Sequence, residues 1–161
     1  MLAASGWLLL VFACPADATG EPIVTVMRQG HGLYKIQAHA LVRASHQTLW
    51  DTLTDYEKFA QFVPGLHASH VMSRSGMRCM VRQQWRVSLL LFSYPIDLTV
   101  LSVERPPSAL EVHLVSGNLK RLDGGYSIEE GPDGRYSVLW DGFVEDSTLF
   151  RIGFPPLSSE N

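Results

Sequence analysis

The most constraining feature of this sequence is a strict alternation of side-chain type over residues 77–91. The odd-numbered positions are mostly apolar, and three of the even-numbered positions are arginine: Arg78, Arg82 and Arg86. In an α-helix these arginines would scatter around the cylinder, whereas successive side chains of a strand point to opposite faces. The segment therefore predicts one long β-strand with an arginine-bearing face and an apolar face.

The same alternation recurs along the rest of the chain. It appears first over residues 34–43, and again over the segments 96–100, 110–114, 122–128 and 136–144. The breaks between the later segments are rich in Gly, Pro, Asn and Asp, which is turn chemistry. This spacing predicts an antiparallel sheet with one covered face and one solvated face. The β-branched run over residues 23–26 is expected to pair at an edge of that sheet.

Two short helices are expected between the first strand and the others. Ser45 stands at an N-cap position before an apolar stripe over residues 46–53. Asp55 is expected to cap a second helix, which Pro64 and Gly65 end. The sequence thus predicts an α+β fold, and the pair at residues 124–125, Gly-Gly, predicts a bulge or bend that helps the sheet to curve.

The first eighteen residues have the pattern of a signal peptide. An apolar run too short to span a bilayer leads into Ala16-Asp-Ala18, which predicts export and cleavage after Ala18. The alternative is a lipoprotein signal that attaches lipid to Cys14. The expected location is therefore periplasmic or secreted, or membrane-anchored through Cys14. Removal of residues 1–18 leaves Cys79 without a disulfide partner, so Cys79 is expected to be a small buried hydrophobic residue.

Composition excludes two classes of protein. The formal net charge is −3, which lacks the basic excess of a nucleic-acid binder, so no nucleic-acid partner is expected. Hydrophobic residues make up 46% of the chain, too many for a disordered tail.

Several short segments carry a resemblance to a known family. Residues 50–57, WDTLTDYE, are followed by Phe62-Val-Pro-Gly-Leu66, by residues 70–74 and by the segments 104–107, 114–117 and 120–126. Together they resemble the polyketide cyclase/dehydrase and lipid-transport family of the START-like, helix-grip (SRPBCC) superfamily. Relatives include coenzyme Q-binding proteins, ribosome-association toxins, aromatic cyclases and lipid carriers. The resemblance implies a seven-stranded antiparallel sheet wrapped around a long C-terminal helix, with an apolar pocket between them.

The resemblance also sets the expected domain organisation: a signal peptide at 1–18, an N-terminal extension at 19–32, a START-like domain at 33–146 and a C-terminal tail at 147–161. The tail contains Pro155 and Pro156 and is too short for the family's C-terminal helix, so that helix is expected to be missing. A truncated frame and a functional variant both fit this ending.

No catalytic motif with a known mechanism occurs in the sequence, and no metal site or cofactor is expected. An apolar pocket needs hydrophobic lining and a few polar groups that orient the ligand. The residues expected to bind ligand are therefore the inward-facing ones and one residue at the pocket mouth: Tyr34, Phe62, Gln83, Trp85, Leu89, Leu98, Val112, Leu114, Tyr126 and Trp140.

Three functions follow as hypotheses. The first is non-catalytic binding or transport of a hydrophobic small molecule, namely a lipid, quinone or polyketide-like compound. The second is an aromatic cyclase or dehydratase in which Tyr126, Tyr34 or Gln83 polarises a carbonyl. The third is a toxin-like protein-interaction module. The apolar run over residues 88–94 adds contact with a membrane surface, or with a second copy of the chain that covers the exposed sheet face, as expected interactions.

Overall fold

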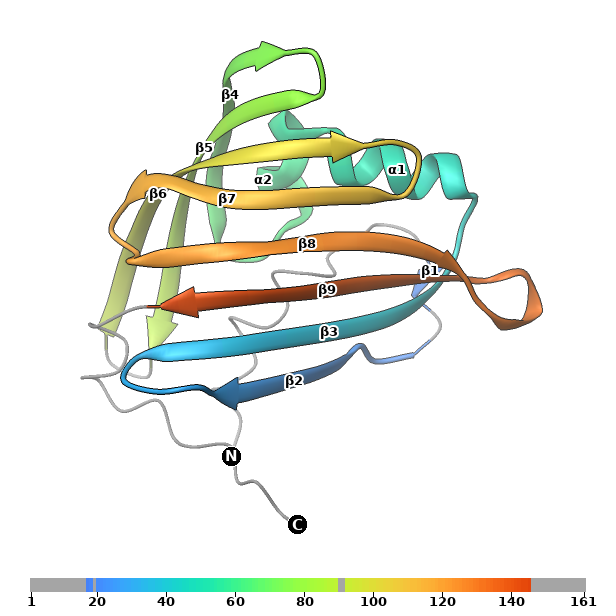
Figure 1. Cartoon of the computed structure of the whole chain (residues 1–161), viewed down its shortest axis with the longest axis horizontal. Helices are drawn as coiled ribbons and strands as arrows, with labels where there is room; N and C mark the ends of the chain where they lie inside the picture. The colour runs from blue at the N-terminus through green and yellow to red at the C-terminus, as the bar shows by residue number, and fades with distance from the viewer. Residues whose placement is uncertain (1–16, 19, 90–91, 146–161) are drawn as a thin grey trace.

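The computed structural model describes residues 17–18, 20–89 and 92–145, with the backbone alone described at residues 17–18, 87–89 and 92. Most of the described chain is β-sheet (Figure 1). The strands are β1 (Asp17–Ala18), β2 (Ile23–Arg28), β3 (Leu33–Arg43), β4 (Leu66–Ser75), β5 (Arg78–Leu89), β6 (Phe92–Arg105), β7 (Ala109–Gly117), β8 (Arg121–Glu130) and β9 (Tyr136–Glu145). A 3₁₀ turn, η3 (Pro132–Gly134), joins the last two strands.

All strand pairs are antiparallel, and the order across the sheet is β1-β3-β9-β8-β7-β6-β5-β4, with β2 also pairing with β3. The strands β3 to β9 account for the seven that the family resemblance implies. The predicted pairing of residues 23–26 is confirmed, because Ile23–Arg28 lie opposite Tyr34–His39. Residues 147–161 lie outside the described part of the chain, and so does all of the expected signal peptide except Asp17 and Ala18.

The helical segments are α1 (His46–Thr54), a 3₁₀ turn η2 (Tyr56–Lys58) and α2 (Phe59–Phe62). Ser45 caps α1 as expected, since its Oγ accepts a hydrogen bond of 3.1 Å from the Thr48 backbone N–H. Asp55 stands at the predicted N-cap position, but its side chain makes no capping hydrogen bond. Its carboxylate instead pairs with the Lys58 ammonium at 2.7 Å, and the second helix opens as a 3₁₀ turn.

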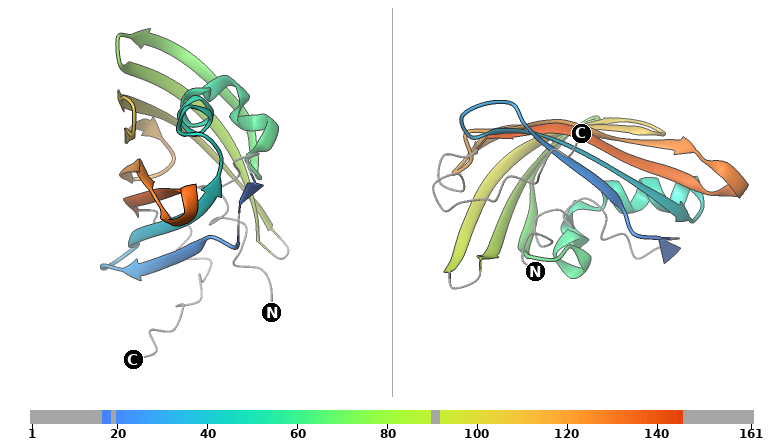
Figure 2. Two further views of the ribbon diagram at one scale, coloured as in Figure 1. Left: turned by 90° about the vertical axis from the view of Figure 1, so that its right-hand side faces the viewer. Right: turned by 90° about the horizontal axis from the view of Figure 1, so that it is seen from below.

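The sheet curves, and both helices lie on its concave side (Figure 2). They pack on two separate clusters of buried side chains. Leu49 of α1 packs on Ala40, Val42, Ile128 and Val138 of β3, β8 and β9. Tyr56 of η2 packs in a cluster over β5, β6 and β7: Cys79, Val81, Ile96, Leu98, Val100 and Leu110. Burial of these apolar side chains is the main force that holds the helices to the sheet.

Of the bulge or bend predicted at residues 124–125, the bulge is absent. Gly124 and Gly125 pair in unbroken register with β7 and β9. A Cβ atom on Gly124 would lie 2.7 Å from the Trp140 ring, and one on Gly142 would lie 2.8 Å from the same ring. These two glycines therefore provide room for the Trp140 indole on the concave face.

Candidate functional site

The concave face carries eight of the ten side chains expected to bind ligand. Strand register places them on one face, because each is buried itself, lies opposite a buried residue of that face, or lies two or four residues along its strand from one. They are Tyr34, Gln83, Trp85, Leu98, Val112, Leu114, Tyr126 and Trp140. Phe62 lies instead at the end of α2, where its ring meets the Phe59 ring edge-on with 5.9 Å between the ring centroids. Leu89 has its backbone in β5, and its side chain is outside the described part.

The centre of this face is apolar and partly open. Leu98 is buried, whereas Trp85, Val112, Leu114 and Tyr126 are only partly buried although they pack against the core. Trp85, Val112 and Leu114 adjoin the cluster that contains Tyr56, and Tyr126 adjoins both clusters. Large apolar side chains that are only partly buried on a concave surface are suited to contact with a hydrophobic ligand.

Tyr126 and Trp140 form the aromatic part of this surface. Their ring centroids are 4.6 Å apart at an angle of 57°. Burial raises the pKa of the Tyr126 phenol, so the group stays neutral at physiological pH. Its hydroxyl makes no hydrogen bond to any residue in the described ranges. Tyr126 therefore offers an apolar ring and one free polar group.

A polar pair interrupts the apolar surface on β4 and β5. In the strand register, Ser69 of β4 lies opposite Gln83 of β5, and Gln83 lies opposite Leu98 of β6. Ser69 is only 2% exposed, and its Oγ has no hydrogen-bond partner. The Gln83 amide hydrogen-bonds no described residue either. Ser69 and Gln83 are called the polar pair below.

A second polar group joins the helical segment to the sheet. The Tyr56 hydroxyl donates to Glu104 Oε1 at 2.9 Å, and Arg74 Nη1 donates to both oxygens of the same carboxylate at 3.0 and 3.2 Å. Glu104 is 8% exposed, so its charge is compensated mainly by Arg74. Burial, followed by the nearby Glu104 charge, raises the pKa of Tyr56. We interpret this group as a structural anchor.

Cys79 lies beside the anchor and is fully buried, as the sequence predicted. Burial raises the pKa of its thiol above the ordinary value, and Arg74 only partly offsets that effect. A buried thiol with a raised pKa is a poor nucleophile. Cys79 therefore has a packing role.

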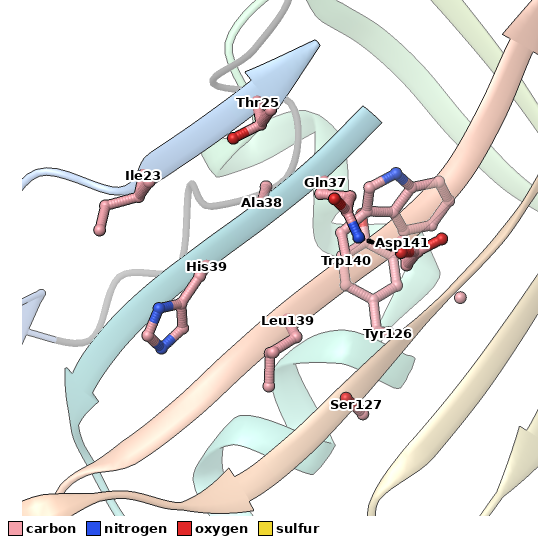
Figure 3. A pocket seen from close by; sticks show the side chains of 11 residues that line it. Ile23, Thr25, Gln37, Ala38, His39, Tyr126, Ser127, Leu139, Trp140 and Asp141 are labelled. Carbon is pink, nitrogen blue, oxygen red and sulfur yellow. Dashed lines mark hydrogen bonds between the residues drawn. The ribbon is translucent and has the colours of Figure 1, made fainter. Parts of the chain in front are cut away.

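The opposite, convex face is polar. Arg82 makes a bidentate contact with Asp97, at 3.2 Å from Nε and 2.7 Å from Nη2. A groove of about 410 Å³ crosses β2, β3, β9 and β8. Figure 3 shows His39, Leu139 and Ser127 side by side across β3, β9 and β8, and the Gln37 amide donates to Asp141.

The lining of this outer groove mixes polar and apolar side chains, among them Ile23 and Leu139. The polar side chains in it include those of Thr25, Gln37, His39, Ser127 and Asp141. Tyr126 and Trp140 also adjoin it, but register places their side chains on the concave face. The described residues contain no cluster of three His, Cys, Asp or Glu side chains that could hold a metal ion. They also contain no helix long and apolar enough to cross a bilayer.

Sequence reasoning missed the polar pair's Ser69 and the anchor. Alternation along the sequence does not reveal β4, because two register shifts, at His67 and Met72, break its period of two. No simple pattern could place Ser69 on the concave face. The anchor joins Tyr56, Arg74 and Glu104 from three distant segments, so spacing along the chain gives no signal for it.

The curved antiparallel sheet and the helices on its concave side define a START-like, helix-grip protein. Solved structures support this fold. The chain is similar to the Zhui aromatase/cyclase from Streptomyces sp. R1128, with 12% identity and a TM-score of 0.62 over 70% of this chain and 67% of that one. It is also similar to a STAR-related lipid transfer protein from Xanthomonas axonopodis, with 11% identity and a TM-score of 0.58 over 76% and 81%.

A START superfamily protein from Mycobacterium smegmatis matches with 15% identity and a TM-score of 0.54 over 69% of this chain and 76% of that one. No curated protein sequence matches the chain. The family model for polyketide cyclase/dehydrase and lipid transport matches residues 42–153, so the chain belongs to that family.

Proposed function

We propose that this protein binds a hydrophobic small molecule on its concave face and carries it without chemical change. The family and the fold agree with hydrophobic ligand binding, polyketide cyclisation or lipid transfer. The observation that carries the proposal is the partly open apolar surface formed by Trp85, Val112, Leu114 and Tyr126. The ligand would be a lipid, a quinone or a polyketide-like compound.

The chemistry of the face supports carriage over catalysis. General acid–base catalysis needs a group whose pKa lies near the working pH and a partner within hydrogen-bond reach. The raised pKa of Tyr126 makes it a weak acid, and its hydroxyl makes no hydrogen bond to any described residue. The Cys79 thiol is buried with a raised pKa as well.

The test is to purify the protein, extract it with organic solvent and identify co-purifying apolar molecules by mass spectrometry. A matched pair of variants localises the binding, because Leu114 is partly buried on the concave face and its neighbour Val115 is 51% exposed. We expect Leu114→Lys to lose the extracted molecule and Val115→Lys to retain it. Ligand-free protein that no lipid or quinone stabilises against heat would refute the proposal.

A cyclase or dehydratase is the second candidate, favoured by the structural similarity to an aromatase/cyclase. In that case the Tyr126 hydroxyl would polarise a substrate carbonyl while the apolar face holds the folded chain. Turnover of a poly-β-ketone mimic by the native protein, together with its loss in Tyr126→Phe, would establish this activity.

We further propose that the chain is exported, on the sequence pattern of residues 1–18. Asp17 and Ala18 pair with Arg43 and Val42 of β3, and cleavage after Ala18 would remove this short bridge. The intact mass of the protein from the cell envelope tests export, because cleavage gives a chain that begins at Thr19. A mass that includes lipid on Cys14 would support the anchored alternative. Membrane contact and dimerisation stay predictions.

A further inference from the structure

The polar pair lies inside an apolar surface. On one side of it, Leu66, Trp85 and Ile96 align across β4, β5 and β6. On the other side, Val71, Val81 and Val100 align in the same way. Ser69 and Gln83 therefore interrupt a surface that is otherwise hydrophobic in both directions along the strands.

An unpartnered hydroxyl at such a position costs free energy of folding. Buried polar groups are almost always hydrogen-bonded, because they lose their water without compensation otherwise. Ser69 is 2% exposed with an unsatisfied Oγ, whereas Gln83 is partly open on the same face. Serine and glutamine can each donate and accept a hydrogen bond, so together they suit an oxygen of a hydroxyl or a carbonyl.

The charges around the pair argue against an anionic ligand. Arg82 and Arg86 alternate with Gln83 along β5 and therefore point to the convex face, where Arg82 is paired with Asp97. On the concave face of these strands the charged residues are Arg74 and Glu104, which neutralise each other. Arg74 lies opposite Cys79 in the strand register. Cys79 is four residues from Gln83, so Arg74 lies about 13 Å along the strands from the polar pair. A carboxylate or phosphate at the pair would lose its water with no cation to replace it.

We propose that the ligand of the concave face is electrically neutral and carries a hydroxyl or carbonyl oxygen that hydrogen-bonds Ser69 and Gln83. This inference rests on the proposed binding function and specifies its ligand class. The apolar rows on either side would contact the hydrocarbon part of the molecule, and Trp85 would lie next to its polar end.

Three probes of equal chain length test the inference: 1-dodecanol, dodecanoate and n-dodecane. Binding is followed by intrinsic tryptophan fluorescence, since Trp85 is two residues from Gln83 on the same face. We expect 1-dodecanol to bind at least about tenfold more tightly than dodecanoate. Loss of one neutral hydrogen bond is expected to weaken 1-dodecanol binding about fivefold in Ser69→Ala and in Gln83→Leu, with n-dodecane binding unchanged. Ser73→Ala, an exposed serine on the same strand, is the matched control.

The outcomes separate the two proposals. Equal affinity for all three probes, or unchanged 1-dodecanol binding in both variants, would overturn the polar-pair inference and leave apolar binding intact. Tightest binding of dodecanoate would also overturn it. Binding of none of the probes would count against the carrier function itself, and circular dichroism confirms that each variant is folded.

Discussion

Replacement of Tyr56 by phenylalanine tests the anchor that holds the helical segment to the sheet. The substitution keeps the ring, which meets Phe59 edge-on at 5.5 Å, and removes only the hydroxyl that donates to Glu104. Both residues are buried, at 3% and 8% exposure. A hydrogen bond to a charged group is worth about 1.5–3 kcal/mol. We therefore expect Tyr56→Phe to lower the free energy of unfolding by about 2 kcal/mol, or Tm by about 4–8 °C.

The assay is urea unfolding followed by tryptophan fluorescence, and Tyr126→Phe supplies the control. That variant makes the same chemical change on the concave side of the sheet, but the Tyr126 hydroxyl has no hydrogen-bond partner among the described residues. Its free energy of unfolding should stay within about 0.5 kcal/mol of the native value. If the two variants lose equal stability, or if Tyr56→Phe loses none, the anchor does not hold the helical segment.

Three further predictions follow from single contacts. Without ligand, Ser69→Ala should raise the free energy of unfolding by about 1 kcal/mol, because an unsatisfied buried hydroxyl is removed. A large decrease in the free energy of unfolding, measured by urea titration, would contradict this. Gly142→Ala should cost about 2 kcal/mol, since its Cβ would lie 2.8 Å from the Trp140 ring, and an unchanged Tm would refute that reason. The hydrogen bond to Asp123 raises the pKa of His113, so this pair stabilises the fold below about pH 6.5. Solvent screens the pair, so its contribution is under about 1 kcal/mol. That contribution should fade as pH rises through the raised pKa of His113. Asp123→Asn should abolish the part of the pH dependence of the urea midpoint that comes from this pair.

The strand faces could be predicted from the sequence because a strand exposes alternate side chains to opposite sides. The arginines of residues 77–91 lie on the convex face, and Trp85 and Gln83 lie on the concave one, as the alternation indicated. Ser45 was recognisable as a helix cap for a similarly local reason. These features depend only on neighbours within a few residues.

The remaining features depend on contacts between distant segments. Register shifts in β4 hide Ser69 from any period-two pattern, because each extra residue reverses which side chains face the core. The need for Gly124 follows from the close approach of β9, where the Trp140 ring, the Asp141 backbone oxygen and the Gly142 Cα leave no room for a Cβ atom. The hydrogen bonds that join Tyr56, Arg74 and Glu104 likewise depend on tertiary packing, and their spacing along the chain does not reveal them.

The most direct test of the account is to locate a bound ligand by NMR with methyl-labelled Ile, Leu and Val residues. We expect nuclear Overhauser contacts between 1-dodecanol and the methyl groups of Leu98, Val112 and Leu114 on the concave face. Contacts confined to Ile23 and Leu139 would place the ligand in the outer groove and contradict the account.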